Sequence, residues 1–166
     1  MKMFKSLLSL ILFSALFAIS SSVSAHILDG AKEWNGHYYK IFQIPMKYED
    51  AKKFCESVGG HLAAPETSTE NEMLKQMFSM CNGIDYCWIG AYRDEQRFWH
   101  WITNKVIADY FDWGKREPGG SQGDFYKTSL CFNRKKECKW ANHYPSESIP
   151  FMCEWEKAED AHESNL

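Results

Sequence analysis

The sequence lacks the short motifs by which common hydrolases and zinc sites are recognised. It contains no HExxH, no nucleophile-elbow motif, no C-x-x-C pair and no paired-carboxylate spacing, so the catalytic classes that need them are disfavoured. Its six histidines are scattered without the spacing of metal ligands. We therefore expect no catalytic residue, and an enzyme is the least favoured of the three functions considered below.

Long apolar segments are also missing after residue 25. The one early run, residues 7–19, is shorter than the roughly 20 residues that a helix needs to cross a bilayer. Lys2 and Lys5 precede this run and the small residues 23–25 follow it, which is the layout of a cleavable secretory signal. We predict a signal peptide at residues 1–25 and a secreted, extracellular protein with no transmembrane segment; a membrane anchor is the alternative.

Positive charge is in short supply. Removing Lys2 and Lys5 with the signal takes the formal net charge from −3 to −5, so there is no electrostatic reason to expect nucleic acid or an anionic membrane as a partner. The one basic cluster, residues 134–136, is followed at once by Glu137. That pattern predicts the solvated tip of a loop. The chain also has no Asn-x-Ser/Thr sequon, so N-glycosylation is not expected.

Cysteine, by contrast, is plentiful beyond the signal. An even number of thiols in an oxidising compartment is expected to pair, and a zinc site is the competing interpretation. Six cysteines allow 15 pairings, and spacing alone does not choose among them. The six are Cys55, Cys81, Cys87, Cys131, Cys138 and Cys153.

Hydrophobic periodicity predicts a mixed α and β domain over residues 26–156. A strand is expected at residues 37–44 and a helix at 48–58, ended by glycines 59 and 60. A second helix should begin at Thr69, capped by its hydroxyl and by Glu72. Further strands are predicted at residues 87–92, 98–102, 128–132, 138–141 and 151–155.

Two segments break this periodicity. Residues 103–126 are rich in glycine and form a long loop, and Tyr110, Phe111 and Trp113 within it indicate an ordered loop that buries aromatic rings. Residues 157–166 are acidic and polar, which predicts a disordered tail.

An ordered set of landmarks gives the chain a family resemblance. They are Cys55, residues 61–63, 88–90, 98–101 and 110–113, Glu117 with Pro118, Cys131, Trp140 and residues 151–154. In this order and spacing they resemble the C-type lectin-like domain in its short form. The resemblance implies an α+β fold in which two helices flank small antiparallel sheets, with the strand at residues 88–90 at the centre of the core and a long loop that carries the ligand site. Independently of the resemblance, tryptophans 88, 99, 101 and 113 are expected to pack in the core, because burying an indole removes a large apolar surface from water.

The resemblance also implies disulfides. It pairs Cys55 with Cys153, which ties the first helix to the last strand. The family's second bridge starts at the position of Cys131, but its usual partner after Trp140 is missing. Cys138 is the substitute partner, which would leave Cys81 with Cys87 as a local bridge.

The family's calcium site is only partly present. By resemblance, the ligand-binding residues are Glu117, Pro118, Asp124 and Asn142, with a cis bond before the proline, and Glu117, Asp124 and Asn142 are the metal ligands. Two ligand positions have lost their side-chain oxygen, since Gly119 and Ala141 stand there. Fewer ligands and less charge predict weak or absent Ca²⁺ binding, although Asp112, Ser121 or Gln122 could fill a vacancy.

Two binding functions follow. The first is a secreted carbohydrate-binding, lectin-type domain with doubtful calcium dependence. The second is a calcium-independent domain that binds a protein or another cell-surface or extracellular ligand through the loop and the 134–136 tip.

Overall fold

The computed structural model describes residues 27–107, 110–119 and 129–157. The predicted signal peptide, Asp124 and nearly all of the acidic tail lie outside these ranges, so those three predictions remain predictions. The chain divides into two units, residues 1–31 and 32–166, and everything below concerns the second. Neither described helix is long and apolar enough to cross a membrane.

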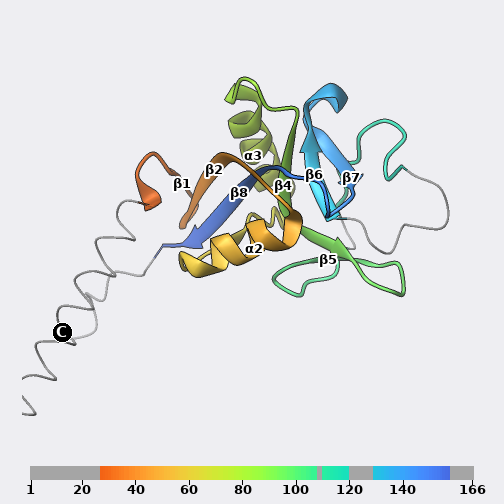
Figure 1. Ribbon diagram of the computed structural model, residues 1–166, viewed down its shortest axis with the longest axis horizontal. Helices are drawn as coiled ribbons and strands as arrows, with labels where there is room; N and C mark the ends of the chain where they lie inside the picture. Colours follow the sequence, from red (N-terminus) through yellow and green to blue (C-terminus); the bar gives the residue numbers. More distant parts are fainter. Residues whose placement is uncertain (1–26, 108–109, 120–128, 158–166) are drawn as a thin grey trace, which may run out of the picture. The chain divides into compact units, whose positions relative to one another are not determined.

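The described strands form one sheet rather than the separate small sheets expected (Figure 1). The main order is β1-β2-β8-β4-β6-β7, with β3 paired to β8 and β5 paired to β4. Every pairing between these strands is antiparallel except β4 with β8, which meet in parallel at Trp88 and Phe151 and so join β1, β2 and β8 to β4, β6 and β7. The strands are β1 Lys32–Trp34, β2 His37–Met46, β3 His61–Leu62, β4 Tyr86–Arg93, β5 Trp99–Trp101, β6 Ser129–Asn133, β7 Lys139–His143 and β8 Ile149–Glu156.

Two helices cover opposite faces of this sheet, as the alternation of side chains along β4 requires. Trp88 points toward α2 (Tyr48–Ser57), where its ring meets Tyr48 edge-on at 5.5 Å between centroids. Its neighbours Cys87 and Ile89 point the other way, into the cluster formed with α3 (Ser68–Met80). Figure 1 shows one helix on each side of the sheet. The predicted strands and both predicted helices are confirmed.

The start of α3 differs from the prediction. Its N-cap is Thr67, whose hydroxyl accepts a hydrogen bond from Glu70 N at 3.2 Å, so the helix begins before Thr69. The side chain of Glu70 turns inward instead of staying at the surface and accepts from Glu66 N at 3.0 Å. The N-cap therefore lies two residues earlier than predicted, and Glu70, not Glu72, is the glutamate three residues after it.

Only the first of the expected disulfides forms. Cys55 and Cys153 are bonded, 98 residues apart in sequence, whereas the other four cysteines have free thiols. The Cys131–Cys138 pairing was wrong because Cys131 on β6 lies opposite Ala141 in the register with β7, three residues past Cys138. Cys87, fully buried on β4 opposite Phe132, and Cys81, the C-cap of α3, both have free thiols, so the expected local bridge does not form either.

Candidate functional site

The segment that carries Glu117 is fixed along the outer edge of β7. Trp140 N donates to the Asp112 carbonyl at 2.8 Å, and Gly114 N donates to the Trp140 carbonyl at 2.9 Å. These bonds hold residues 112–114 as an additional short stretch beside the edge strand, with Trp113 bridged in parallel to Trp140. Glu117 is thereby brought next to Asn142, which lies two residues further along β7.

The Trp140 side chain anchors the same segment from the other direction. The indole is fully buried and its Nε1 donates to Asn71 Oδ1 on α3 at 2.7 Å. Asn71 Nδ2 in turn donates to Asp112 Oδ2 at 2.9 Å and to the Tyr110 hydroxyl at 3.0 Å. Helix, loop and strand therefore share one buried amide, which fixes residues 110–114. The prediction that this loop buries its aromatic rings was wrong for Phe111, which is exposed, and holds only in part for Tyr110 and Trp113, which are partly buried. Residues 108–109 and 120–126 of the predicted loop lie outside the described residues.

Glu117, Pro118 and Asn142 come together as the resemblance implied, and the Glu117–Pro118 bond is cis. Asn142 forms two hydrogen bonds with the peptide of Gly119. Its Oδ1 accepts from Gly119 N at 2.6 Å, and its Nδ2 donates to Gly119 O at 2.9 Å. Gly119 N also donates to Glu117 Oε2 at 2.8 Å. The Asn142 side chain and the Oε2 oxygen of Glu117 thus already have hydrogen-bond partners within the chain.

The Oε1 oxygen of Glu117 is bound by Lys136. The sequence pattern had predicted that Lys136 lies at the solvated tip of a loop, so this prediction was wrong for Lys136. The Lys136 ammonium pairs with Glu117 Oε1 and also donates to the Lys115 carbonyl at 3.4 Å. Its stem crosses Gly114 so closely that a Cβ there would lie 2.9 Å from Lys136 Cβ. The Glu117 side chain is consequently only 8% exposed. Nothing local signalled this pair, since 19 residues separate its members.

The arrangement does not fit a calcium ion. Ca²⁺ needs six to eight oxygen ligands, and here both Glu117 oxygens and the Asn142 oxygen already have donors within the chain. Gly119 and Ala141 supply no side-chain oxygen. Among the described residues, no group of three or more His, Cys, Asp or Glu is placed to hold a metal. We therefore assign calcium no role in the described geometry.

The fold and this site can now be compared with known proteins. Residues 44–155 match the sequence model of the Lectin C-type domain. This chain belongs to the C-type lectin domain family. It is 33% identical over 141 residues to one chain of the snaclec coagulation factor IX/factor X-binding protein of Trimeresurus stejnegeri, covering 81% of this chain and 88% of the relative.

Two further matches agree. "Snaclec 3" of Sistrurus catenatus edwardsii is 30% identical over 144 residues, covering 82% of this chain and 89% of that protein. The solved structure described as "Ca2+-independent C-type lectin SPL-2 from Saxidomus purpuratus" superposes with a TM-score of 0.66 at 27% identity, covering 78% of this chain and 94% of that chain. The C-type lectin fold predicted from the landmarks is confirmed.

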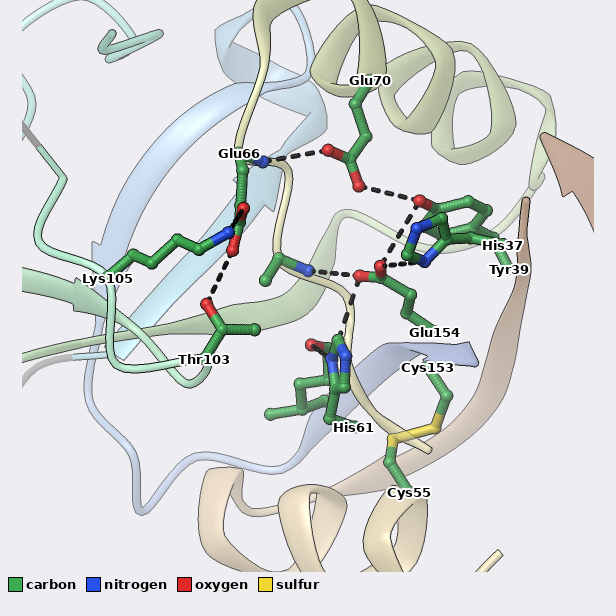
Figure 2. A network of polar contacts seen from close by, with 12 residues as sticks. His37, Tyr39, Cys55, His61, Glu66, Glu70, Thr103, Lys105, Cys153 and Glu154 are labelled. Carbon is green, nitrogen blue, oxygen red and sulfur yellow. Dashed lines mark hydrogen bonds and ion pairs between the residues drawn. A yellow bond between two sulfur atoms is a disulfide. The ribbon is translucent and has the colours of Figure 1, made fainter. Parts of the chain in front are cut away.

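A second polar cluster lies on the side of the sheet near β2 and α3, and sequence reasoning missed it. Figure 2 shows the carboxylates of Glu70 and Glu154 with the Tyr39 hydroxyl between them. The hydroxyl donates to Glu70 Oε1 at 2.8 Å and lies 3.5 Å from Glu154 Oε1. Both carboxylates are nearly fully buried. They line one end of a groove of about 370 Å³.

The partners of Glu154 come from three segments. Ala64 N donates to Glu154 Oε2 at 2.9 Å, and the His37 and His61 rings lie 3.0 and 3.9 Å from its oxygens. Burial raises the pKa of the Glu154 carboxyl, against the backbone bond and the imidazoles that lower it. Burial likewise raises the pKa of Glu70, and the hydrogen bond from Tyr39 only partly offsets this. The only sequence signal was a glutamate inside the apolar run 151–155.

We predict that the Glu117–Lys136 pair is energetically coupled. Lys136→Met leaves a carboxylate that is 8% exposed without its cation and should lower the free energy of unfolding by about 2 kcal/mol. Glu117→Gln/Lys136→Met should lose less than the single variant, since no unpaired charge remains. Urea unfolding of the wild type, both single variants and the double variant measures this coupling.

Lys135→Met is the control, because its partner Asp85 is half exposed. If the losses of the two single variants add up to the loss of the double variant, the coupling is contradicted.

We also predict a pH signature for the second cluster. A carboxyl whose folded pKa lies above its unfolded value of about 4.3 binds its proton more tightly in the native state. Its stabilising contribution is present at low pH and is lost as pH rises. The free energy of unfolding of the wild type, measured against Glu70→Gln, should therefore fall as the pH rises above the unfolded pKa of about 4.3.

The control for this titration is Glu72→Gln, which removes an equal charge from the same helix where the side chain is 59% exposed. A wild type that gains stability over Glu70→Gln as pH rises would show that burial does not dominate at Glu70.

Proposed function

We propose that this chain is a secreted recognition domain that binds carbohydrate without calcium. The observation that carries the proposal is the ammonium of Lys136 on Glu117, together with the two hydrogen bonds between Asn142 and Gly119. The groups that would share a calcium ion with a sugar are engaged within the chain. Any sugar must then be contacted by side chains directly.

The chemistry of an ammonium supports this assignment. A bound calcium ion recruits two sugar hydroxyls because it has coordination positions to spare. Lys136 supplies one positive charge and three donors, and it directs them to Glu117 Oε1 and to the Lys115 carbonyl. Lys136 neutralises Glu117 and fixes the loop, but an ammonium has no coordination positions with which to bind two sugar hydroxyls as a calcium ion does.

One comparison and several features of the chain add support. The solved relative from Saxidomus purpuratus is described as a calcium-independent C-type lectin, so the family accommodates recognition without the ion. The predicted signal at residues 1–25 and the Cys55–Cys153 disulfide favour an oxidising, extracellular location. Binding rather than catalysis is proposed because the sequence carries none of the hydrolase motifs considered above.

A protein ligand is the second candidate. The Trimeresurus stejnegeri relative is named for binding coagulation factor IX and factor X, and a site without calcium suits a protein surface as well as a glycan. The same residues would serve either ligand class, so the two candidates are separated by binding experiments rather than by geometry.

A glycan array probed twice tests the proposal, once with millimolar calcium and once with EDTA. We expect the same glycans to be bound with the same intensity in both, because Glu117 and Asn142 are already satisfied. Binding that disappears with EDTA would overturn the calcium-independent mechanism. Absence of binding in both conditions would remove carbohydrate and leave the protein ligand.

A further inference from the structure

Basic side chains converge on one groove next to the Glu117 site. The groove has a volume of about 680 Å³, and it lies between the loop segment before Glu117 and the turn from η2 (Arg134–Lys136) into β7. Five cationic residues line it: Lys115, Arg116, Lys135, Lys136 and Lys139. They come from two segments about 20 residues apart in sequence, so the sequence shows only the 134–136 half of the cluster.

The first residue of that sequence cluster has a different role. Arg134 does not line the groove but reaches the C-terminal end of α3, where its guanidinium donates to Phe78 O at 2.8 Å and to Ser79 O at 3.0 Å. It also donates to Ile84 O at 2.6 Å. A cation at this end of a helix is favoured by the exposed carbonyls. Arg134 therefore fixes η2 against α3 and presents Lys135 and Lys136 to the groove.

Two of the groove cations are uncompensated. Lys135 pairs with Asp85 at 3.0 Å, Lys136 with Glu117, and Lys139 lies 3.8 Å from Asp112. Among the described residues, Lys115 and Arg116 have no carboxylate partner, and both side chains are exposed. A full chain of formal charge −3 thus presents concentrated positive charge at this groove, which raises the local concentration of anions there.

The groove also has an aromatic wall. Trp113 lines it and is held from behind by Trp99 and Trp140, at 5.2 and 5.8 Å between ring centroids. An indole fixed in this way offers a rigid apolar surface at little entropic cost, and its ring can pack against the apolar face of a sugar. Cations flanking an aromatic surface suit a ligand that carries both rings and negative charge.

We propose that this groove binds a polyanionic polysaccharide, one whose sugar rings carry sulfate or carboxylate groups. The inference rests on the proposed carbohydrate-binding function and names its ligand class. Lysines dominate the groove, and their compact, rotatable ammonium groups suit charges spaced along a flexible chain. An acidic peptide is disfavoured because the β7 edge beside the groove is already bonded to residues 112–114, so a peptide cannot add there as a strand.

Binding of heparin, measured by calorimetry over a range of salt concentrations in EDTA, tests the proposal. Lys115→Gln/Arg116→Asn removes the two uncompensated charges, and asparagine tolerates the φ of 67° at position 116. We expect the dissociation constant of this variant to rise roughly ten-fold and the slope of log affinity against log salt to fall by about two.

Two matched variants sharpen the test. Lys47→Gln/Lys53→Gln removes the same charge from two exposed positions, the N-cap of α2 and a residue within that helix. This variant should bind heparin as the wild type does. Glu137→Gln removes the carboxylate that lines the groove and should tighten binding. Melting temperatures of all variants should match the wild type because the side chains changed are exposed. Equal weakening by both double variants would show non-specific attraction and overturn the assigned site.

Neutral dextran and poly-L-glutamate complete the experiment. Poly-L-glutamate bound as tightly as heparin would overturn the polysaccharide assignment in favour of an acidic protein. If heparin fails to bind while neutral glycans bind on the array, this inference fails and the proposed function stands. If no glycan of either kind binds, both fail.

Discussion

The placement of the binding region depends on one residue, Trp140. Its backbone pairs with Asp112 and Gly114, while its buried indole donates to Asn71 on α3. Asn71 then donates to Asp112, so the loop is fixed to the strand and to the helix through the buried Trp140 and Asn71 side chains and the partly buried Asp112. A buried polar network of this kind specifies one arrangement because each broken bond would leave an unsatisfied group.

The consequence of that placement is an internal cation where the family has a metal site. Once residues 112–114 lie along β7, Gly114 leaves room for the Lys136 stem, and the ammonium reaches Glu117. The loop keeps the Glu-Pro pair and its cis bond, so the backbone shape associated with calcium binding is retained without the ion. We propose that ligand recognition shifts to a neighbouring surface, the groove beside Lys115 and Trp113, where five cationic side chains converge.

Sequence patterns predicted the fold well where a signal is local. The helix at Tyr48 and the strands followed from periodicity. The Cys55–Cys153 bridge, which spans 98 residues, followed only from the family resemblance. Cys138 was misassigned because disulfide pairing depends on strand register, and the β6–β7 register places Cys131 against Ala141. Sequence spacing carries no information about register until the turn geometry is known.

The sequence predicted where the candidate site lies, but not which side chains bind one another there. Glu117, Pro118 and Asn142 were found from the family pattern, and the loss of ligands at Gly119 and Ala141 pointed away from a standard calcium site. Lys136 and Arg134 were expected to be solvated because their partners lie far away in sequence, on the loop and at the end of α3. The buried pair Glu70 and Glu154 was missed for the same reason, since helix and strand patterns do not show which faces meet.

The claim that Lys136 takes the place of calcium is tested most directly by a crystal structure of the chain grown with millimolar calcium. The account predicts that the Lys136 ammonium stays on Glu117 and that Asn142 keeps both bonds to Gly119. A calcium ion coordinated by Glu117, with Lys136 turned away into solvent, would contradict it.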